Sequence, residues 1–189
     1  MKKMNNKGFS LVELIIVIAI MAILAGAIAP ALIRYIDKSR KSNDISSAKT
    51  IKTAVETAMA NEDTYELLTT GTTASITDED SNVIVYNGNV TITPGSVTNN
   101  NGTGITLTVK GSVLNKVAAD VESAAKTEIG KNIGEKTPKL KFKKDPADGT
   151  DKPDKFNVYC TAGGNVVVGM TTSGNKFYQL APDVSKYYQ

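Results

Sequence analysis

The most pronounced pattern in the sequence is a long apolar run near its start that carries no charge. From Leu14 to Ile33 the chain contains no Asp, Glu, Lys or Arg. As a helix rising ~1.5 Å per residue, about 20 residues span roughly 30 Å, the hydrocarbon thickness of a bilayer. The run therefore predicts a helix that can cross a membrane. Basic residues are almost equally frequent on both sides of the run, so flanking charge does not decide its orientation. Long regions cross a membrane largely regardless of charge, which indicates that the long region after the run is external and the short basic start is cytoplasmic.

Beyond Ile33 the apolar positions recur at intervals of three and four residues, which is the pattern of an amphipathic helix. The members of this stripe are Ile45, Ala48, Ile51, Val55, Ala58 and Met59. Together the two patterns predict one helix from Phe9 to about Asn61, roughly 80 Å long. Its second half is expected to pack the stripe against a sheet.

Gly26 and Pro30 weaken this predicted helix at one place. Pro30 has no amide hydrogen to donate to the carbonyl of Gly26, and glycine is itself a weak helix former. We expect a kink or local melting of the helix at these two residues. The alternative is a proline that an ordinary membrane helix tolerates.

After Ser75 the pattern changes to β-strands. In VIVYNGNVTIT, Asn87-Gly88 separates two β-branched runs and predicts a hairpin with a type I′ turn. Short loops between the later runs imply antiparallel pairing. The further predicted strands are GITLTVKG, KLKFKK, KFNVYCTA, NVVVGMT and KFYQLA.

A second helix interrupts the strands. Apolar residues from Val113 to Ile129 have helical spacing, with Ser112 as N-cap and Gly130 as C-terminal stop. The expected fold class is α+β. A long spine helix, half transmembrane and half amphipathic, packs on an antiparallel β-sheet head that contains the inserted second helix.

The composition of the 189-residue chain argues against an enzyme, because it has no histidine and one cysteine, Cys160. Without histidine, no nucleophile–His–acid arrangement is possible, and the usual structural zinc sets cannot form. A glycine-rich phosphate loop is also absent. We therefore expect no enzymatic activity and no cofactor. Cys160 lies in the apolar run FNVYC, which indicates a buried, inert thiol.

Two acidic stretches raise the question of a calcium site. The stretch Asp78–Asn82 begins like a calcium loop, but Val83 and Asn89 stand where an EF-hand requires Gly and Glu. The later loop DPADGTDKPD is turn-rich and could wrap a hard cation. Its carboxylates are Asp145, Asp148, Asp151 and Asp154. A solvated surface loop is the preferred interpretation, with calcium binding as the alternative.

The segment KTPKLKFKK, residues 136–144, is the one candidate for binding nucleic acid, with Phe142 as its single aromatic residue. Charge runs are generally solvated faces. Nucleic acid is therefore not expected as a partner.

Glu13 is the only formal charge between Lys7 and Arg34. An acidic residue costs about 3 kcal/mol at a bilayer centre and less near its edge, so Glu13 needs a partner or a purpose. The stretch KGFSLVEL has Gly8 before Phe9 and Glu13 four residues later, and an apolar helix with an internal proline follows. This arrangement resembles the start of a type IV prepilin. The alternatives are an acid that snorkels to the interface from a single-pass anchor, and a cleaved secretory signal.

The resemblance implies cleavage between Gly8 and Phe9 by a membrane prepilin peptidase, N-methylation of the new Phe9 amine, and retention of the apolar segment. It also implies that Glu13 pairs with the Phe9 amine of a neighbouring subunit, which would set the register of assembly. In this family the helix just before the proline is often unwound in filaments.

Four regions follow from the resemblance and the patterns together. They are a leader at 1–8, a hydrophobic stem helix at 9–33, the amphipathic half of the spine at 34–61, and a globular head at 62–189. Loss of the leader removes three lysines, so the formal charge changes from +3 to +3 − 3 = 0. The basic balance of the whole chain thus gives no support for nucleic-acid binding.

By this resemblance the expected function is the major structural subunit of a type IV pilus that serves motility, adhesion or biofilm growth. The expected partners are further copies in a helical filament, prepilin peptidase, an inner-membrane platform protein, and assembly and retraction ATPases. The chain would wait in the cytoplasmic membrane and then enter an extracellular surface pilus.

Other functions share parts of these features. A minor pilin or a type II secretion pseudopilin would have the same stem, whereas a monomeric membrane-anchored adhesin or a DNA receptor would not need to polymerise. Many Gram-negative pilins close a C-terminal loop with a cysteine pair, which this chain lacks. That departure favours a Gram-positive or anaerobic host.

Overall fold

The computed structural model describes residues 9–96, 102–109, 117–147 and 149–189. Contacts divide the chain into two compact units, which meet between Ser39 and Arg40. The boundary falls inside helix α1, Leu11–Ala58. The first unit therefore contains the first part of α1, and the second contains the remainder of α1 and all the strands.

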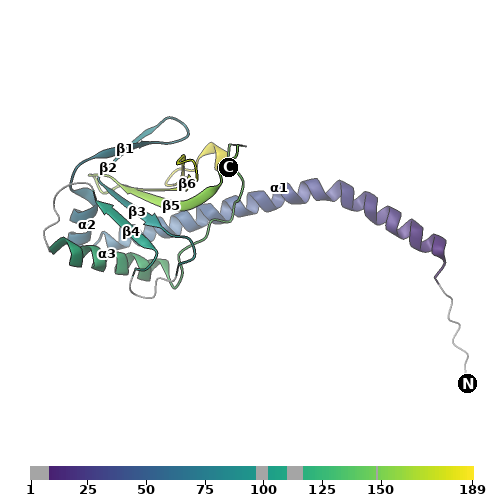
Figure 1. Ribbon diagram of the computed structural model, residues 1–189, viewed down its shortest axis with the longest axis horizontal. Helices are drawn as coiled ribbons and strands as arrows, with labels where there is room; N and C mark the ends of the chain where they lie inside the picture. Colours follow the sequence, from purple (N-terminus) through teal and green to yellow (C-terminus); the bar gives the residue numbers. More distant parts are fainter. Residues whose placement is uncertain (1–8, 97–101, 110–116, 148) are drawn as a thin grey trace, which may run out of the picture. The chain divides into compact units, whose positions relative to one another are not determined.

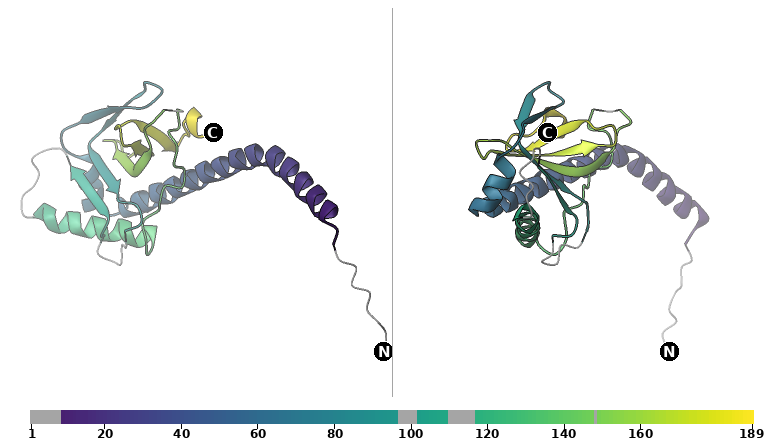
Figure 2. Two further views of the ribbon diagram at one scale, coloured as in Figure 1. Left: turned by 45° about the vertical axis from the view of Figure 1, so that its right-hand side comes forward. Right: turned by 60° about the vertical axis from the view of Figure 1, so that its left-hand side comes forward.

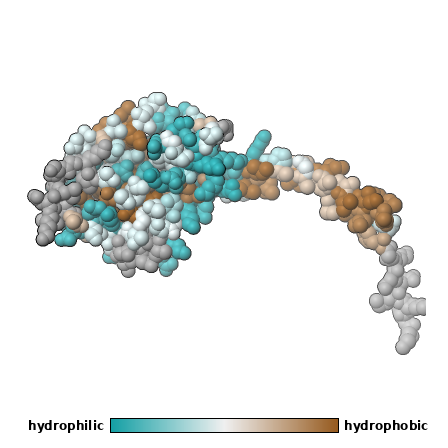
Figure 3. Space-filling model, viewed as in Figure 1, coloured by the Kyte–Doolittle hydropathy of each residue, from teal (hydrophilic) through white to brown (hydrophobic). Residues whose placement is uncertain are grey.

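In the first unit α1 has the composition that the apolar run predicted. By length and composition, it is the one helix in the described ranges that could cross a membrane. Its large apolar side chains are exposed, and Figure 3 shows hydrophobic residues gathered along this part of the helix. No other element of the first unit is described that could cover them.

In the second unit α1 carries the predicted apolar stripe, and the rest of the unit buries it. Ala48, Ile51, Ala54, Val55 and Ala58 are all buried, one face of the helix being apolar. The observed helix ends three residues before the predicted end at Asn61, as fraying and capping allow.

The strands in the described residues form two antiparallel sheets (Figure 1). The smaller sheet pairs β1 with β2, and the larger has the order β4-β3-β5-β6-β7. The strand bounds are β1 Ala74–Thr77, β2 Val83–Tyr86, β3 Gly88–Ile92, β4 Ile105–Val109, β5 Pro153–Cys160, β6 Val166–Thr172 and β7 Phe177–Ala181. This architecture confirms the predicted antiparallel sheet and four of the later strands.

The predicted hairpin at Asn87-Gly88 is wrong. β2 pairs with β1, whereas β3 pairs with β4 and β5, so the chain passes from one sheet to the other at these residues. Neither residue has a positive φ. A Cβ on Gly88 would lie 2.6 Å from the carbonyl oxygen of Leu68. Glycine is needed here for a close approach of two backbones, and not for a type I′ turn.

A short helix that the sequence did not predict follows α1. Helix α2 spans Glu62–Thr69, and the Asn61 side chain caps it by accepting a hydrogen bond from the Thr64 amide at 3.2 Å. Eight residues are too few for a clear helical period, which explains the omission.

Helix α3, Val117–Ile133, is the predicted inserted helix. Its predicted N-cap Ser112 lies outside the described residues. The predicted stop at Gly130 is wrong, because the helix continues to Ile133. Gly134 ends it instead, with φ of 107° and an amide that donates to the Gly130 carbonyl at 3.0 Å. Figures 1 and 2 show α3 beside the second half of α1, on the same side of the larger sheet.

The predicted strand KLKFKK does not belong to either sheet. Leu140 and Phe142 are buried and the lysines between them are exposed, so the alternation that suggested a strand is present. Its backbone amides, however, donate to the carboxylate of Asp44 in α1, and not to a neighbouring strand. The segment is extended chain that a side chain holds against the helix.

The core lies between the larger sheet and the helices. It joins the stripe of α1 to inward side chains of β3, β5, β6 and β7 and to α3. The C-terminal 3₁₀ helix, Lys186–Tyr188, adds Tyr188, which is 1% exposed. The largest fully buried side chains include Tyr178, Tyr188, Phe156, Phe177 and Ile51.

Candidate functional site

The start of α1 carries the predicted processing and assembly residues. Gly8 lies outside the described residues, and Phe9, the first described residue, has a side chain that is 75% exposed. Glu13 lies in the first turn of α1 and is also exposed. Its Oε2 atom accepts a hydrogen bond from the Ser10 amide at 2.9 Å.

This hydrogen bond gives Glu13 a structural role that the sequence analysis missed. A Ser followed three residues later by Glu forms a capping box, in which the carboxylate accepts the amide of the cap residue. A negative charge in the first turn also interacts favourably with the helix dipole. The Ser10–Glu13 spacing itself could have predicted the contact. A carboxylate can accept more than one hydrogen bond, so capping leaves acceptor capacity for an amine.

The first unit exposes apolar side chains along its part of α1. The large apolar side chains that it exposes between Phe9 and Ile36 are 39% to 75% accessible. Contiguous exposed apolar surface of this kind marks a site of contact with a membrane or another protein.

The predicted weak point of the helix lies within this surface. α1 continues through Gly26 and Pro30 without interruption. A Cβ added at Gly26 would meet no atom within 4 Å, so another helix could approach the backbone closely there. Melting of the helix at these residues stays a prediction.

In the second unit a fully buried carboxylate, Asp44, fastens two distant segments to α1. Its oxygens accept hydrogen bonds from the amides of Lys141 at 2.6 Å and Phe142 at 2.9 Å, and from the Tyr188 hydroxyl at 3.4 Å. Burial raises the pKa of Asp44 above its usual value, while the two amides, Tyr188 and the charge of Lys143 oppose this shift.

The sequence analysis did not single out Asp44. Its position one helical turn before Ala48, on the apolar stripe, was the available signal, since a charge there must be buried or must break the stripe. One turn earlier still, the Lys41 ammonium donates to the Tyr187 carbonyl at 2.6 Å and lies 5.2 Å from the centre of the Phe142 ring. The C-terminus and the segment around Phe142 are thus both tied to α1.

In the candidate calcium loop, the carboxylate of Asp145 accepts hydrogen bonds from the backbone of the loop itself. Asp145 is buried, and its oxygens accept hydrogen bonds from the amides of Ala147 at 2.9 Å and Asp151 at 3.0 Å. Asp148 lies outside the described residues, and Asp154 is exposed. Across the described ranges, no group of three or more His, Cys, Asp or Glu side chains is placed to hold a metal ion.

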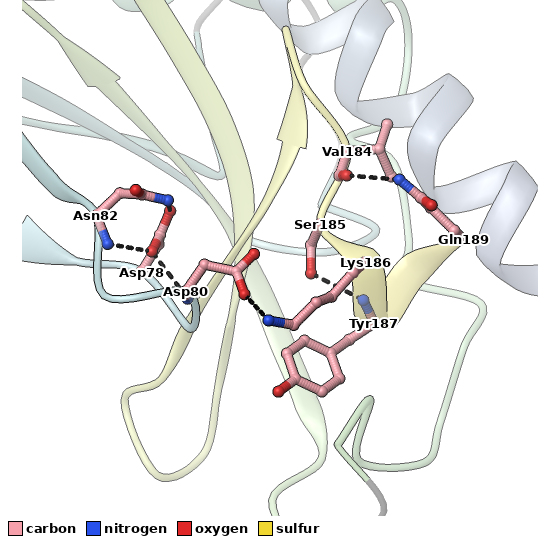
Figure 4. A network of polar contacts seen from close by, with 8 residues as sticks. All are labelled: Asp78, Asp80, Asn82, Val184, Ser185, Lys186, Tyr187 and Gln189. Atoms are coloured by element: carbon pink, nitrogen blue, oxygen red, sulfur yellow. Dashed lines mark hydrogen bonds and ion pairs between the residues drawn. The ribbon is translucent and has the colours of Figure 1, made fainter.

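The acidic stretch that follows β1 closes onto itself and onto the C-terminus (Figure 4). Asp78 Oδ1 accepts hydrogen bonds from the amides of Asp80 at 2.9 Å and Asn82 at 2.8 Å. Asp80 forms an ion pair with Lys186. Burial raises the pKa of Glu79. The stretch holds a turn against the C-terminal helix and does not form an EF-hand loop.

The basic segment of residues 136–144 does not expose its one aromatic side chain, Phe142, for stacking on a base. Phe142 is 4% exposed and packs edge to face on Tyr188, with ring centres 5.7 Å apart. It cannot stack on a base while it is part of the core.

Comparison with known proteins adds independent observations. Residues 3–29 match the family description "Prokaryotic N-terminal methylation motif". The type IV major fimbrial protein FimA of Dichelobacter nodosus is 31% identical over 132 residues, which cover 69% of this chain and 82% of that protein. The chain belongs to the type IV pilins.

Two further relatives match this pilin over shorter lengths. Fimbrial protein Q of Moraxella bovis is 40% identical over 83 residues, 44% of this chain and about half, 51%, of that protein. The type IV major pilin protein PilA of Myxococcus xanthus is 37% identical over 61 residues, 32% of this chain and 28% of that protein. No solved structure matches the pilin with significance.

Family membership confirms the resemblance that KGFSLVEL suggested and places the pilin among structural proteins of fimbriae, in agreement with the expectation that it is not an enzyme. The expectation of a Gram-positive host has no support among the relatives that match.

Cys160 of the pilin is buried, and burial raises the pKa of its thiol to about 12. The structure thus confirms the predicted burial of Cys160. The raised pKa supports the prediction that the thiol is inert, since the thiolate is the reactive form of cysteine.

Proposed function

We propose that this pilin is the major structural subunit of a type IV pilus. The observation that carries the proposal is the match to a major fimbrial protein over 82% of that protein's length. The exposed apolar surface of the first unit supports it, because a filament of packed stems would bury that surface.

Processing is the first step of the proposed function. The prepilin peptidase cleaves between Gly8 and Phe9, and the new Phe9 amine is methylated. The methylation motif that matches residues 3–29 supports this step. The regions that result are the leader 1–8, the stem 9–33, the amphipathic half of the spine 34–61 and the head 62–189.

Before assembly the pilin resides in the cytoplasmic membrane, with its stem in the bilayer and its head outside. The uncharged length from Leu14 to Ile33 and the exposed apolar side chains of the first unit support this location. Assembly then moves the subunit into an extracellular pilus.

During assembly Glu13 receives the Phe9 amine of the neighbouring subunit. In the free subunit its carboxylate accepts the Ser10 amide, which leaves acceptor capacity for the incoming ammonium. An ion pair in an apolar filament interior is costly to break by removing one partner, about 3–5 kcal/mol, so a neighbour out of register is disfavoured. Local melting at Gly26 and Pro30 then adjusts the length of the stem.

The filament requires partners beyond copies of the pilin itself. These are the prepilin peptidase, an inner-membrane platform protein, and the ATPases that drive assembly and retraction. The finished pilus serves motility, adhesion or biofilm growth.

Intact-mass and N-terminal analysis of sheared surface filaments tests the proposal. We expect a dominant subunit that begins at N-methyl-Phe9. Filaments in which the chain is a trace component would instead support a minor pilin. A full-length chain that stays in the membrane would support a monomeric anchored protein.

A further inference from the structure

The head of the pilin carries a row of positive charges that the proposed stem contacts do not use. Lys139, Lys141 and Lys143 are exposed, and Leu140 and Phe142 between them are buried. Alternation in extended chain directs the three lysines to one side, with successive residues of the row roughly 7 Å apart. We call these three lysines the basic ridge.

Hydrogen bonds tie the backbone of the ridge to α1. The amides of Lys141 and Phe142 both donate to the buried carboxylate of Asp44 in α1. The aliphatic part of the Lys139 side chain lies against Gly95. A Cβ added to Gly95 would collide with the Cε atom of Lys139. Charges on fixed backbone lose less conformational entropy on binding than charges on a free loop, so this surface is suited to a specific contact.

The same head carries a groove of opposite charge. A cavity of about 540 Å³ opens between the end of α1, α2 and α3, and Asp63, Asp120 and Glu128 are among its lining residues. Asp63 and Asp120 are exposed, and in the part of the chain that the structure describes neither forms an ion pair. We call this the acidic groove.

Charge is segregated along the chain around the groove. From residue 53 to residue 109 the sequence contains no Lys or Arg. Its acidic residues over that range are Glu56, Glu62, Asp63, Glu66, Asp78, Glu79 and Asp80. The groove residues from α1 and α2 therefore have no Lys or Arg in their own range. Helix α3, which contributes Asp120 and Glu128, carries Lys126 and Lys131, and these pair with Glu122 and Glu128.

The two surfaces lie at different levels of the second unit. Asp44 anchors the ridge, and Thr57 and Ala58 line the groove. On a helix rising ~1.5 Å per residue, Asp44 and Ala58 are roughly 20 Å apart along the axis. Ridge and groove are thus too far apart to neutralise each other within one head, but two copies displaced along α1 could bring them together.

We propose that the basic ridge of one pilin docks at the acidic groove of the next copy in the filament. The proposal rests on the proposed function, since it supplies a contact between heads in addition to the contacts of the stems. A contact between two different surfaces of identical chains does not satisfy itself in a dimer and can propagate into a helical filament. Complementary charge also selects the register of the incoming subunit.

A second copy fits these surfaces better than nucleic acid does. Phe142 is buried, so the ridge has positive charge without a stacking platform. The chain itself presents a groove with the opposite charge at a fixed height, whereas nucleic acid would need no such groove.

Charge reversal in the full-length pilin tests the contact. One variant carries K139E and K141E, a second carries D63K and D120K, and a third combines all four changes. We expect each of the first two to lower the yield of sheared filaments by about tenfold or more, because like charges facing across an interface are strongly disfavoured. The combined variant should recover most of the wild-type yield. D63N with D120N should give a smaller loss.

Controls separate the contact from general effects. K152E with K155E reverses the same amount of charge at the start of β5, outside ridge and groove, and should leave the yield unchanged. Subunit mass and protease resistance in detergent check that each variant is processed and folded.

Three outcomes would overturn the inference. One is normal filament yield from K139E with K141E. Another is a combined variant that is no better than the worse of its parents. A third is normal filaments that lose binding to duplex DNA with the ridge reversed, which would assign the ridge to nucleic acid. All three leave wild-type filaments in place, whereas absence of filaments from the wild type would refute the proposed function itself.

Discussion

The two parts of helix α1 differ in how far their apolar side chains are exposed to solvent. In the first unit large apolar residues such as Ile23 and Leu11 are more than 70% exposed, whereas in the second unit Ile51 and Val55 are fully buried. From Leu14 to Ile33 the first part is apolar all round, and the second part has one apolar stripe. A stripe can be buried within one chain. A helix that is apolar on every side cannot bury its whole surface within one subunit. It therefore needs lipid or other copies of the chain around it.

The largest expected effect comes from the one acid in the exposed part. Glu13→Val should abolish detectable filaments, because an unpaired Phe9 ammonium in an apolar interior costs about 3–5 kcal/mol, a factor of roughly 150 to 5,000. The measurement is the yield of sheared filaments, with subunit mass as a check on processing. Glu56→Val makes the same change on an exposed face of the second part and should leave filaments intact. A normal yield of filaments from Glu13→Val would refute the proposed pairing of Glu13 with the Phe9 amine of the neighbouring subunit.

The next effect separates the two parts by their role in the subunit alone. Ile51→Ala should lower the free energy of unfolding by about 2–5 kcal/mol, because it opens a cavity in the core. Ile23→Ala, the matched change in the exposed part, should leave that free energy within about 0.5 kcal/mol of wild type. Thermal unfolding of the full-length chains in detergent measures both. Equal losses would mean that the first part is also packed in the free subunit.

A third test asks how far the second part depends on its buried acid. Asp44→Asn replaces one acceptor oxygen by a donor, leaving an amide of Lys141 or Phe142 without its partner. We expect a loss of about 1–3 kcal/mol in the free energy of unfolding at neutral pH. Denaturant unfolding at several pH values gives the measurement.

The pH dependence of this variant has a definite sign. The folded pKa of Asp44 is raised above its unfolded value, so the folded state holds the proton more tightly. The wild type should therefore gain stability relative to Asp44→Asn as the pH falls through the folded pKa towards the ordinary value near 3.8. A stability difference that shrinks over this range would show that the carboxylate is better stabilised as an anion than we infer.

The last comparison takes one glycine from each part, and the smallest expected effect is that of Gly26. Gly88→Ala should destabilise the head by about 1–3 kcal/mol, because its Cβ would press on the Leu68 carbonyl. Gly26→Ala has open space around it and should raise helix stability by about 0.5–1 kcal/mol. Thermal unfolding of the head and helicity of the full chain in detergent report the two. No destabilisation by Gly88→Ala would mean that α2 and β3 can move apart easily.

The sequence alone determined the features that depend on local pattern. The apolar run, the stripe of α1, four of the five later strands and the prepilin-like start all arise from the order of residues over a few turns, and each is present in the fold or in the family match. The Ser10–Glu13 cap was equally local and could have been predicted from its spacing.

Tertiary structure decided the features in which residues far apart in the chain compete for the same backbone. Asn87-Gly88 has the composition of a hairpin turn, yet β3 pairs with β4 and β5 on both sides and not with β2, so the chain passes from the smaller sheet to the larger at these residues. The segment around Phe142 alternates like a strand, but Asp44, nearly a hundred residues earlier, supplies the acceptors for its amides. Local pattern says which groups must be buried or bonded, and long-range packing chooses the partners, because hydrogen bonds and burial do not depend on distance along the sequence.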